Sequence, residues 1–207
     1  MADAPLIGVL ALQGDFAAHG RVLRGLGARV REVRVPGDLE DLEGLVIPGG
    51  ESTTMTLGIE REGLAEPLRE LIGVPPTRGV PVLGSCAGLI MLDRDHLGLM
   101  DIRAERNAFG RQLQSFEVDI ELRGIDRADA ASGEAPQEPD GGSRDGSPLR
   151  AVFIRAPWIA EHGPAVEILA ELDGHPVAAR QGRMFAVAFH TELTDDDRVH
   201  RLFLSAV

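Results

Sequence analysis

Three short apolar runs, each followed by glycine and a helical pattern, most strongly constrain what this chain of 207 residues can fold into. The runs are Leu6 to Leu12, Gly44 to Pro48 and Val80 to Gly84. Unbroken apolar runs of this kind are typical of parallel strands that are buried on both faces. Apolar residues recur at helical spacing between the runs, at Val22, Leu23 and Leu26, and again at Leu64, Leu68, Leu71 and Ile72. The alternation predicts an α/β fold with three layers, in which helices cover both faces of a mostly parallel open sheet.

The pattern changes after Leu99 to short segments that are typical of strands in antiparallel pairs. These segments are Phe116 to Leu122, Ala151 to Ile154, Val166 to Leu172, Val177 to Ala179 and Met184 to Phe189. A final helix is expected from about Asp195 to Leu204, where apolar residues share one face. We therefore expect a single domain over residues 1–207, with antiparallel strands in its C-terminal half.

The segment Asp126 to Pro148 differs in kind, because it is rich in glycine, proline, acids and serine and has almost no large apolar side chain. Such a segment cannot bury enough surface to offset the entropy lost on ordering. We interpret residues 126–148 as a mobile insertion loop within the domain. A regulatory role and a merely tolerated insertion both remain open.

Composition excludes several classes of function. With 33 acidic against 21 basic residues the formal charge is −12, so the chain lacks the basic footprint of a nucleic-acid-binding protein. It has no charged-then-apolar leader and no apolar run near the ~20 residues that cross a bilayer, so we expect no membrane contact and a cytoplasmic location. The single cysteine cannot form an internal disulfide and lacks the companions of a zinc site. No metal or cofactor is expected.

That single cysteine, Cys86, follows an apolar strand within Gly84-Ser85-Cys86-Ala87-Gly88. A Gly-x-Cys-x-Gly segment predicts a sharp strand-to-helix turn that projects the side chain above the sheet, as a nucleophile requires. The turn would lie at the sheet edge where α/β proteins bind ligands, together with Gln13-Gly14-Asp15 and Gly49-Gly50-Glu51-Ser52. The alternative is a cysteine that acts only as a small buried hydrophobe.

A thiol nucleophile needs a base and a group that orients the base. Of the six histidines, only His190 closes a strong apolar strand, and Glu192 lies two residues on. If the chain stays extended through Thr191, both side chains lie on one side and the carboxylate can set the imidazole tautomer. This predicts a Cys86-His190-Glu192 triad, against the alternative of a histidine that only bonds backbone at a strand end. No catalytic role is expected for the other histidines, of which His19 and His200 fall in helical patterns and His96, His162 and His175 in turn-like stretches.

The segment after the second apolar run predicts donors for an oxyanion. Gly49 and Gly50 allow backbone N–H groups to approach a ligand closely, and Ser52 is predicted to cap the next helix. The N–H of Ala87 is the second expected donor, because it follows the nucleophile and opens a helix whose N-terminus favours a thiolate. The alternative is a tight turn that needs glycine only for steric reasons.

These motifs and their order resemble the triad-type (class I) glutamine amidotransferases, whose open sheet is flavodoxin-like. Further matches are Leu12-Gln13-Gly14-Asp15, Glu105-Arg106-Asn107-Ala108-Phe109-Gly110-Arg111-Gln112, Phe153-Ile154-Arg155-Ala156-Pro157 and Glu192-Leu193-Thr194-Asp195-Asp196. They span nearly the whole chain and are most similar to the glutaminase subunits of pyridoxal 5'-phosphate synthase. Thr191 departs from the family, which usually has proline there.

The resemblance implies that Cys86 attacks the side-chain amide of L-glutamine, that His190 protonates the departing ammonia, and that water then releases glutamate. The implied substrate-binding residues are Gly50, Glu51, Ser52, Arg106, Ile154 and Arg155. Guanidinium groups suit the α-carboxylate of glutamine, although each arginine could instead form a surface ion pair. Gln13 is implied at the junction with a partner subunit.

The implied partner is the pyridoxal 5'-phosphate synthase subunit, to which the ammonia is channelled within a ring-shaped hetero-oligomer. Three alternatives remain open from the sequence. The chain could be a glutaminase for another synthase, a cysteine hydrolase on the same sheet, or a silent binding module.

Overall fold

The computed structural model describes residues 3–73, 79–109, 115–124 and 148–207. Within them a seven-stranded sheet has the order β2-β1-β3-β4-β11-β10-β9. The strands are β1 Leu6–Leu10, β2 Arg29–Val33, β3 Gly44–Ile47, β4 Val82–Ser85, β9 Glu167–Leu172, β10 His175–Gln181 and β11 Met184–Val187. The pairs from β2 to β11 are parallel, whereas β10 is antiparallel to both of its neighbours. The predicted mostly parallel sheet with antiparallel strands in the C-terminal half is confirmed.

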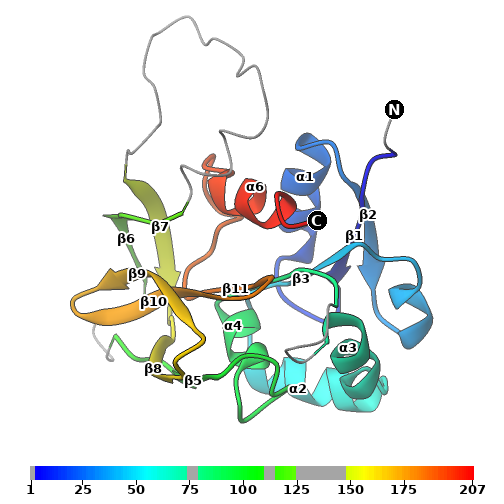
Figure 1. Cartoon of the computed structure of the whole chain (residues 1–207), viewed down its shortest axis with the longest axis horizontal. Coiled ribbons are helices and arrows are strands. Elements are labelled where there is room, and N and C mark those ends of the chain that lie inside the picture. The colour runs from blue at the N-terminus through cyan, green and yellow to red at the C-terminus, as the bar shows by residue number, and fades with distance from the viewer. Residues whose placement is uncertain (1–2, 74–78, 110–114, 125–147) are drawn as a thin grey trace, which may run out of the picture.

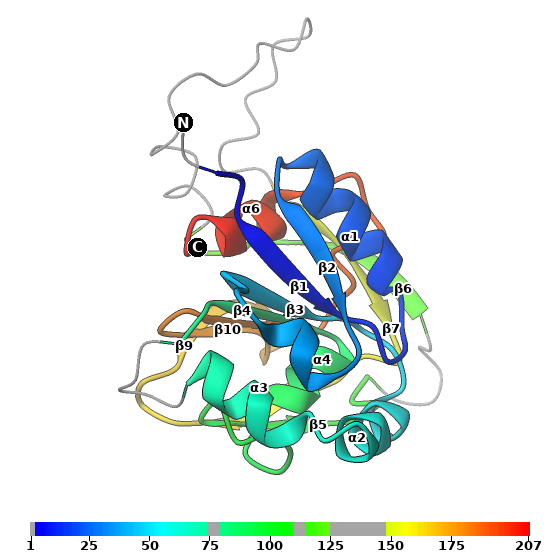
Figure 2. The same cartoon turned by 90° about the vertical axis from the view of Figure 1, so that its right-hand side faces the viewer.

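Helices cover both faces of this sheet and make three layers (Figures 1 and 2). The helices α1 Phe16–Gly25 and α6 Arg198–Leu204 lie on one face, and α2 Ser52–Arg61, α3 Ala65–Ile72 and α4 Ala87–Leu92 lie on the other. A short 3-10 helix, η1, spans Pro36–Leu39. The first helix begins after Asp15, whose side chain accepts a hydrogen bond from the Ala18 N–H, and its Leu23 is fully buried. Capping and an apolar face thus place α1 directly after β1.

Two small antiparallel sheets complete the described part of the chain. They pair β5 Ile102–Glu105 with β8 Trp158–His162, and β6 Ser115–Ile120 with β7 Leu149–Ile154. The predicted insertion at residues 126–148 lies outside the described residues except for Pro148, so its character remains a prediction. The strands on either side of it, β6 and β7, pair directly with each other.

Several element boundaries differ from the predictions, for physical reasons. The last parallel strand, β11, ends at Val187 and not at Phe189, because the chain turns before His190. The last helix begins at Arg198 and not at Asp195, with Asp197 as its N-cap residue. The strands β2, β5 and β8 were not predicted, because most of their side chains are at least partly exposed and form no apolar run.

The turn between β4 and α4 requires a close backbone approach. A Cβ at Gly88 would lie 2.0 Å from the carbonyl oxygen of Ile47 on β3, so any larger residue pushes the helix away from the sheet. All residues of α4 are buried, and α4 packs against β3, β4 and β11. Glycine at position 88 therefore sets how deeply this helix seats on the sheet.

We expect Gly88→Ala to lower the free energy of unfolding by about 1 to 3 kcal/mol, as overpacking in a tight core does. The measurement is urea unfolding followed by circular dichroism. Gly25→Ala is the matched control, because a Cβ at Gly25 meets nothing within 4 Å. That variant should gain about 0.4 to 1 kcal/mol from the lower entropy of its unfolded chain. Equal stability of the two variants would contradict the steric account.

Candidate active site

Cys86 is the only residue between β4 and α4. Its backbone has φ 48° and ψ −105°, a left-handed conformation that is strained for a residue with a Cβ. The backbone is held there by a hydrogen bond from the Cys86 N–H to the carbonyl of Val187, at 2.8 Å. The side chain is 5% exposed. This geometry is that of the predicted elbow, with the sulfur at the carboxyl edge of the sheet.

His190 and Glu192 are in direct contact beyond the end of β11. The His190 Nδ1 lies 2.7 Å from Glu192 Oε1, and the His190 N–H donates to the Val152 carbonyl at 2.9 Å. The prediction that the chain stays extended through Thr191 is wrong, because the chain forms a turn there. The turn nevertheless brings the carboxylate onto the imidazole. Since Nδ1–H donates to Glu192, the His190 Nε2 is the atom left for a reacting group.

The imidazole also lies beside the cysteine. A Cβ at Gly49 would lie 2.5 Å from His190 Cε1 and 3.2 Å from Cys86 Cβ, so both side chains flank this glycine. Burial alone would lower the pKa of His190, but hydrogen bonds to Cys86 and Glu192 and the charges of both outweigh it and raise this pKa to about 10. His190 is therefore protonated at neutral pH, in the form that pairs with a thiolate.

Glu192 also contacts a second histidine, His19, for which no catalytic role is expected from the sequence. The His19 Nε2 lies 3.2 Å from Glu192 Oε2, and both side chains are fully buried. Burial would raise the pKa of Glu192, but the contacts with His19 and His190 outweigh it and hold this pKa well below its usual range. The carboxylate therefore stays ionised. No sequence pattern pointed to His19, because a helical position says nothing of contacts with a distant loop.

A cavity of about 410 Å³ opens over the sulfur, a volume in the range of small-molecule sites. Its lining residues are Gln13, Gly50, Glu51, Ser52, Cys86, Ala87, Ile90, Arg106, Asn107, Ile154, Arg155, Pro157 and His190. Two predicted site residues are not in the lining: Gly49 lies against the His190 ring, and Glu192 lies behind it. Ile90, Asn107 and Pro157 line the cavity but were missed. Asn107 and Pro157 are close in sequence to the predicted arginines, and Ile90 lies one helical turn after Cys86.

The Gly50-Glu51-Ser52 segment is tied to the loop after β1. The Glu51 N–H donates to the Gln13 Oε1 at 3.0 Å. Ser52 does not cap α2 as predicted. The cap is Glu51, whose carboxylate accepts hydrogen bonds from the N–H groups of Thr53 and Thr54, at 3.0 and 2.7 Å. The hydrogen bonds from Thr54, then that from Thr53, lower the pKa of Glu51 to about 2, so it is an anion at the cavity rim.

The two predicted arginines enter the cavity wall differently. The Arg106 Nη2 lies 3.3 Å from Glu51 Oε1 and 3.3 Å from Thr53 Oγ1, and its side chain is 49% exposed. Arg155 has a left-handed backbone with φ 44°. The preceding Ile154 directs its carbonyl oxygen at the sulfur, 3.9 Å from Cys86 Sγ. The cavity thus brings together a thiol, a protonated imidazole and two guanidinium groups.

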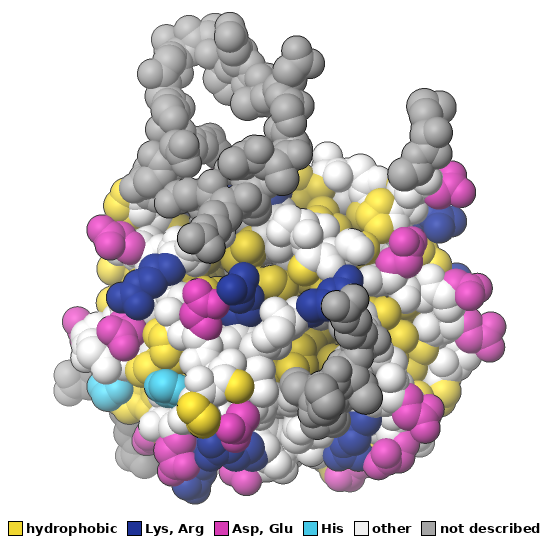
Figure 3. All heavy atoms as spheres, in the orientation of Figure 1, with side chains coloured by type: hydrophobic (Ala, Val, Ile, Leu, Met, Phe, Trp, Pro, Cys, Tyr) yellow, Lys and Arg dark blue, Asp and Glu magenta, His cyan; other side chains and the backbone are white. Residues whose placement is uncertain are grey.

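Figure 3 shows acidic and basic side chains interspersed over one face of the molecule. Among the described residues, no group of three His, Cys, Asp or Glu side chains could hold a metal ion. None of the helices described here is long and apolar enough to cross a membrane.

The chain is similar over nearly its whole length to proteins of a known family. The chain is 45% identical over 217 residues to the pyridoxal 5'-phosphate synthase subunit PdxT of Mycolicibacterium vanbaalenii, covering 99% of each chain. It is 48% identical over 215 residues to the subunit of the same name from Clavibacter sepedonicus, covering 99% of this chain and 92% of the relative. A crystal structure of a glutamine amidotransferase is similar with a TM-score of 0.80 and 38% identity, covering 97% of this chain and 99% of that one. The family model of the SNO glutamine amidotransferases matches residues 9–207, and the chain therefore belongs to that family.

Proposed function

We propose that this chain is a glutaminase that hydrolyses L-glutamine to L-glutamate and ammonia, and that a pyridoxal 5'-phosphate synthase subunit consumes the ammonia. The observation that carries the proposal is His190, held between Glu192 and Cys86 at the floor of a cavity. Relatives named as subunits of pyridoxal 5'-phosphate synthase support the choice of partner. A cytoplasmic location is part of the proposal.

The first half-reaction uses the sulfur of Cys86 and the imidazole of His190 beside it. The Cys86 thiolate attacks the side-chain carbonyl carbon of glutamine and forms a C–S bond, while the carbonyl electron pair moves onto oxygen. The imidazolium of His190 then gives its Nε2 proton to the amide nitrogen, the C–N bond breaks and ammonia leaves. Glu192 stabilises the charged ring throughout. The product of this half is a γ-glutamyl thioester.

Backbone N–H groups stabilise the oxyanion of that step. The donors are at Gly49 or Gly50 and at Ala87, the first residue of α4. Gly50 has φ 143° and lies against the amide of Gln13, so the position of this loop depends on the loop after β1. Donors of this kind contribute about 3 to 4 kcal/mol each where one has been removed by mutation.

The second half-reaction regenerates the enzyme. The neutral imidazole takes a proton from water, hydroxide attacks the thioester carbonyl, and the C–S bond breaks to release glutamate and the thiolate. Arg106 and Arg155 would hold the α-carboxylate of glutamine during both halves, with Ser52 and the backbone of Ile154 completing the pocket. The anion Glu51 at the rim suits the α-ammonium group.

Gln13 is placed to transmit contact with the synthase. Its side-chain oxygen accepts from the Glu51 N–H, so a partner that displaces the loop after β1 changes the oxyanion loop as well. We therefore expect the complex to hydrolyse glutamine faster than the chain alone.

The direct test is glutamate release by the purified chain, with and without the synthase subunit. Cys86→Ala should lower kcat by at least about 1,000-fold, because no other group can form the thioester. Arg61→Gln on α2 is the control and should leave the rate unchanged, because the Arg61 side chain pairs with Glu62 on the surface and does not line the cavity. A Cys86→Ala variant with full activity would end the triad assignment. If a different synthase, and not the pyridoxal 5'-phosphate synthase subunit, stimulated glutamate release, the proposed partner would be wrong but the glutaminase activity would stand.

The state of His190 can be tested without substrate. In Cys86→Ala the hydrogen bond and charge of the sulfur are lost, whereas burial, which lowers the pKa, remains. We therefore expect the His190 pKa to fall from about 10 when the ring is followed by NMR titration. The control is Arg61→Gln, in which His190 should titrate as in the unchanged chain. An unchanged pKa in Cys86→Ala would show that the sulfur does not pair with the ring.

Substrate binding predicts a different kinetic signature. Arg106→Gln removes a guanidinium group from the cavity. We expect the KM for glutamine to rise about tenfold or more, with kcat nearly constant. The reason is that a hydrogen bond to a charged group contributes about 1.5 to 3 kcal/mol to binding. Arg103→Gln is the matched control, because Arg103 on β5 pairs with Glu161 and Asp95 outside the cavity. A fall in kcat with unchanged KM would contradict the carboxylate-binding role.

A further inference from the structure

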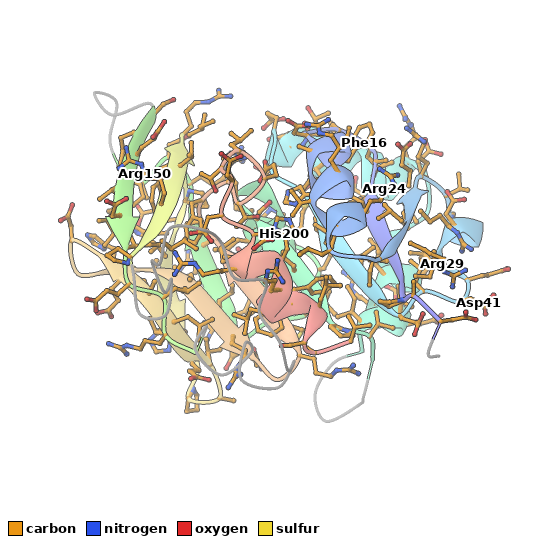
Figure 4. The ribbon with its side chains drawn as sticks, turned by 90° about the horizontal axis from the view of Figure 1, so that it is seen from above. Phe16, Arg24, Arg29, Asp41, Arg150 and His200 are labelled. Carbon is orange, nitrogen blue, oxygen red and sulfur yellow. The ribbon has the colours of Figure 1, made fainter. Side chains whose placement is uncertain are left out.

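A group of buried polar side chains lies behind the proposed triad. It consists of Glu192, His19 on α1, Ser85 on β4 and His200 on α6, and we call it the buried histidine cluster. His19, Ser85 and His200 are fully buried, and so is the side chain of Glu192. Figure 4 shows α1 and α6 side by side over the sheet, with His200 on α6. Three separate elements thus supply the polar groups of the cluster, and His19 is the one that contacts the orienting carboxylate.

The contacts form a chain that ends at Glu192. The His200 Nε2 lies 3.0 Å from His19 Nδ1. On the other side of the His19 ring, Nε2 lies 3.1 Å from Ser85 Oγ and 3.2 Å from Glu192 Oε2. Glu192 Oε2 has no partner of good hydrogen-bond geometry among the described residues. The His19 N–H is therefore shared, with the better bond to Ser85 and a close electrostatic contact to the carboxylate.

The protons in the cluster can be assigned from these partners. Glu192 is a carboxylate and only accepts, so the His19 Nε2 that faces it bears a proton. Burial lowers the pKa of His200 to about 3, so that ring is neutral. The His200 Nδ1 has no partner among the described residues, so its single proton belongs on Nε2 and is donated to His19 Nδ1. The ring N–H groups of His200 and His19 are thus both directed along the cluster toward Glu192.

We propose that His19 is a positioning residue of the glutaminase, a second imidazole that holds the Glu192 carboxylate in the orientation that His190 needs. This inference rests on the proposed function and extends it to a residue outside the triad. One oxygen of Glu192 serves His190, at 2.7 Å, and the other faces His19. A partial rotation of the carboxylate about its terminal bond would weaken both the hydrogen bond to His190 and the electrostatic contact with His19.

Energetics favour a positioning role over simple packing. Removing His19 takes away the electrostatic contact of the second Glu192 oxygen, so the buried carboxylate becomes free to rotate or to take up a proton. Two buried histidines are themselves costly to desolvate, and an apolar pair of similar size would pack as well without that cost. The polar cluster is therefore explained by what it does for Glu192. The other charged group near His200 is Asp197, at the N-cap of α6 and paired with Arg201.

The test uses two polar replacements of similar size. In His19→Gln the side-chain amide reaches the place of Nε2 and can still donate toward Glu192. In His19→Asn the amide reaches only the place of Nδ1, so it can contact His200 but not Glu192. Glutamate release in the presence of the synthase subunit is measured for both variants over pH, and thermal unfolding checks that each one is folded.

We expect His19→Asn to lower kcat about 10- to 100-fold with little change in KM, the loss seen when an outer orienting partner is removed. The acidic limb of its kcat profile should move to higher pH, because Glu192 loses a contact that keeps it ionised. His19→Gln should restore most of the rate and the original limb. His96→Gln is the control, because His96 also contacts a carboxylate, Asp93 at 2.7 Å, but outside the site.

Equal rates for His19→Asn and the unchanged chain would overturn the inference. Equal losses in the Asn and Gln variants, or a loss with an unmoved acidic limb, would also overturn it, because packing alone would then account for His19.

If His19→Asn does not fold, Ser85→Ala and His19→Gln are compared instead. Ser85→Ala frees the His19 N–H for Glu192, so a tenfold loss in Ser85→Ala with a stable fold would overturn the proposal. An unchanged chain without glutaminase activity would refute the proposed function itself.

Discussion

The site depends on a strand that passes into a helix through one residue. β4 ends at Ser85 and α4 begins at Ala87, so Cys86 alone makes the turn and takes a left-handed backbone. A conformation of this kind costs about 1 to 3 kcal/mol and persists only where the surroundings enforce it. Here the enforcement is close packing, because α4 is wholly buried and Gly88 lies directly against the backbone of β3. The position of the sulfur is thus set by the core and not by a loop.

The topology of the sheet then brings the base to the sulfur. β11 comes from the far end of the chain but pairs in parallel with β4, with Val187 opposite Ser85. That pairing places the carboxyl end of β11 beside the elbow, and the Cys86 N–H bonds to Val187 across it. Since β11 stops before His190, a second support is needed. β7 provides it through the Val152 carbonyl, and the same strand ends in the Ile154 carbonyl that faces the sulfur.

Local motifs predicted more of the site than of its surroundings. The elbow at Cys86 could be predicted because its glycines and small residues dictate a turn within a few positions. The contact between His190 and Glu192 was predicted correctly, but the extended backbone assumed for it was wrong. Two residues at a spacing of two can bring their side chains together in a turn as well as in a strand. β2 escaped prediction because an edge strand with exposed side chains has no apolar run. The contacts of His19 and His200 were not predicted, because helical spacing indicates which face of a helix is buried but not which polar groups lie against that face.

The loop and helix after β1 contact both sides of the reacting atoms. Gln13 bonds the backbone of Glu51 beside the oxyanion donors, and His19 contacts the carboxylate behind His190. Asp15 caps the helix between them, so the two contacts belong to one short rigid unit. A displacement of α1 along its axis therefore changes the oxyanion loop and the orienting acid together. Under the proposed function, the oxyanion loop and the orienting acid support opposite charges of the same transition state, so this unit would alter the rate through both of them.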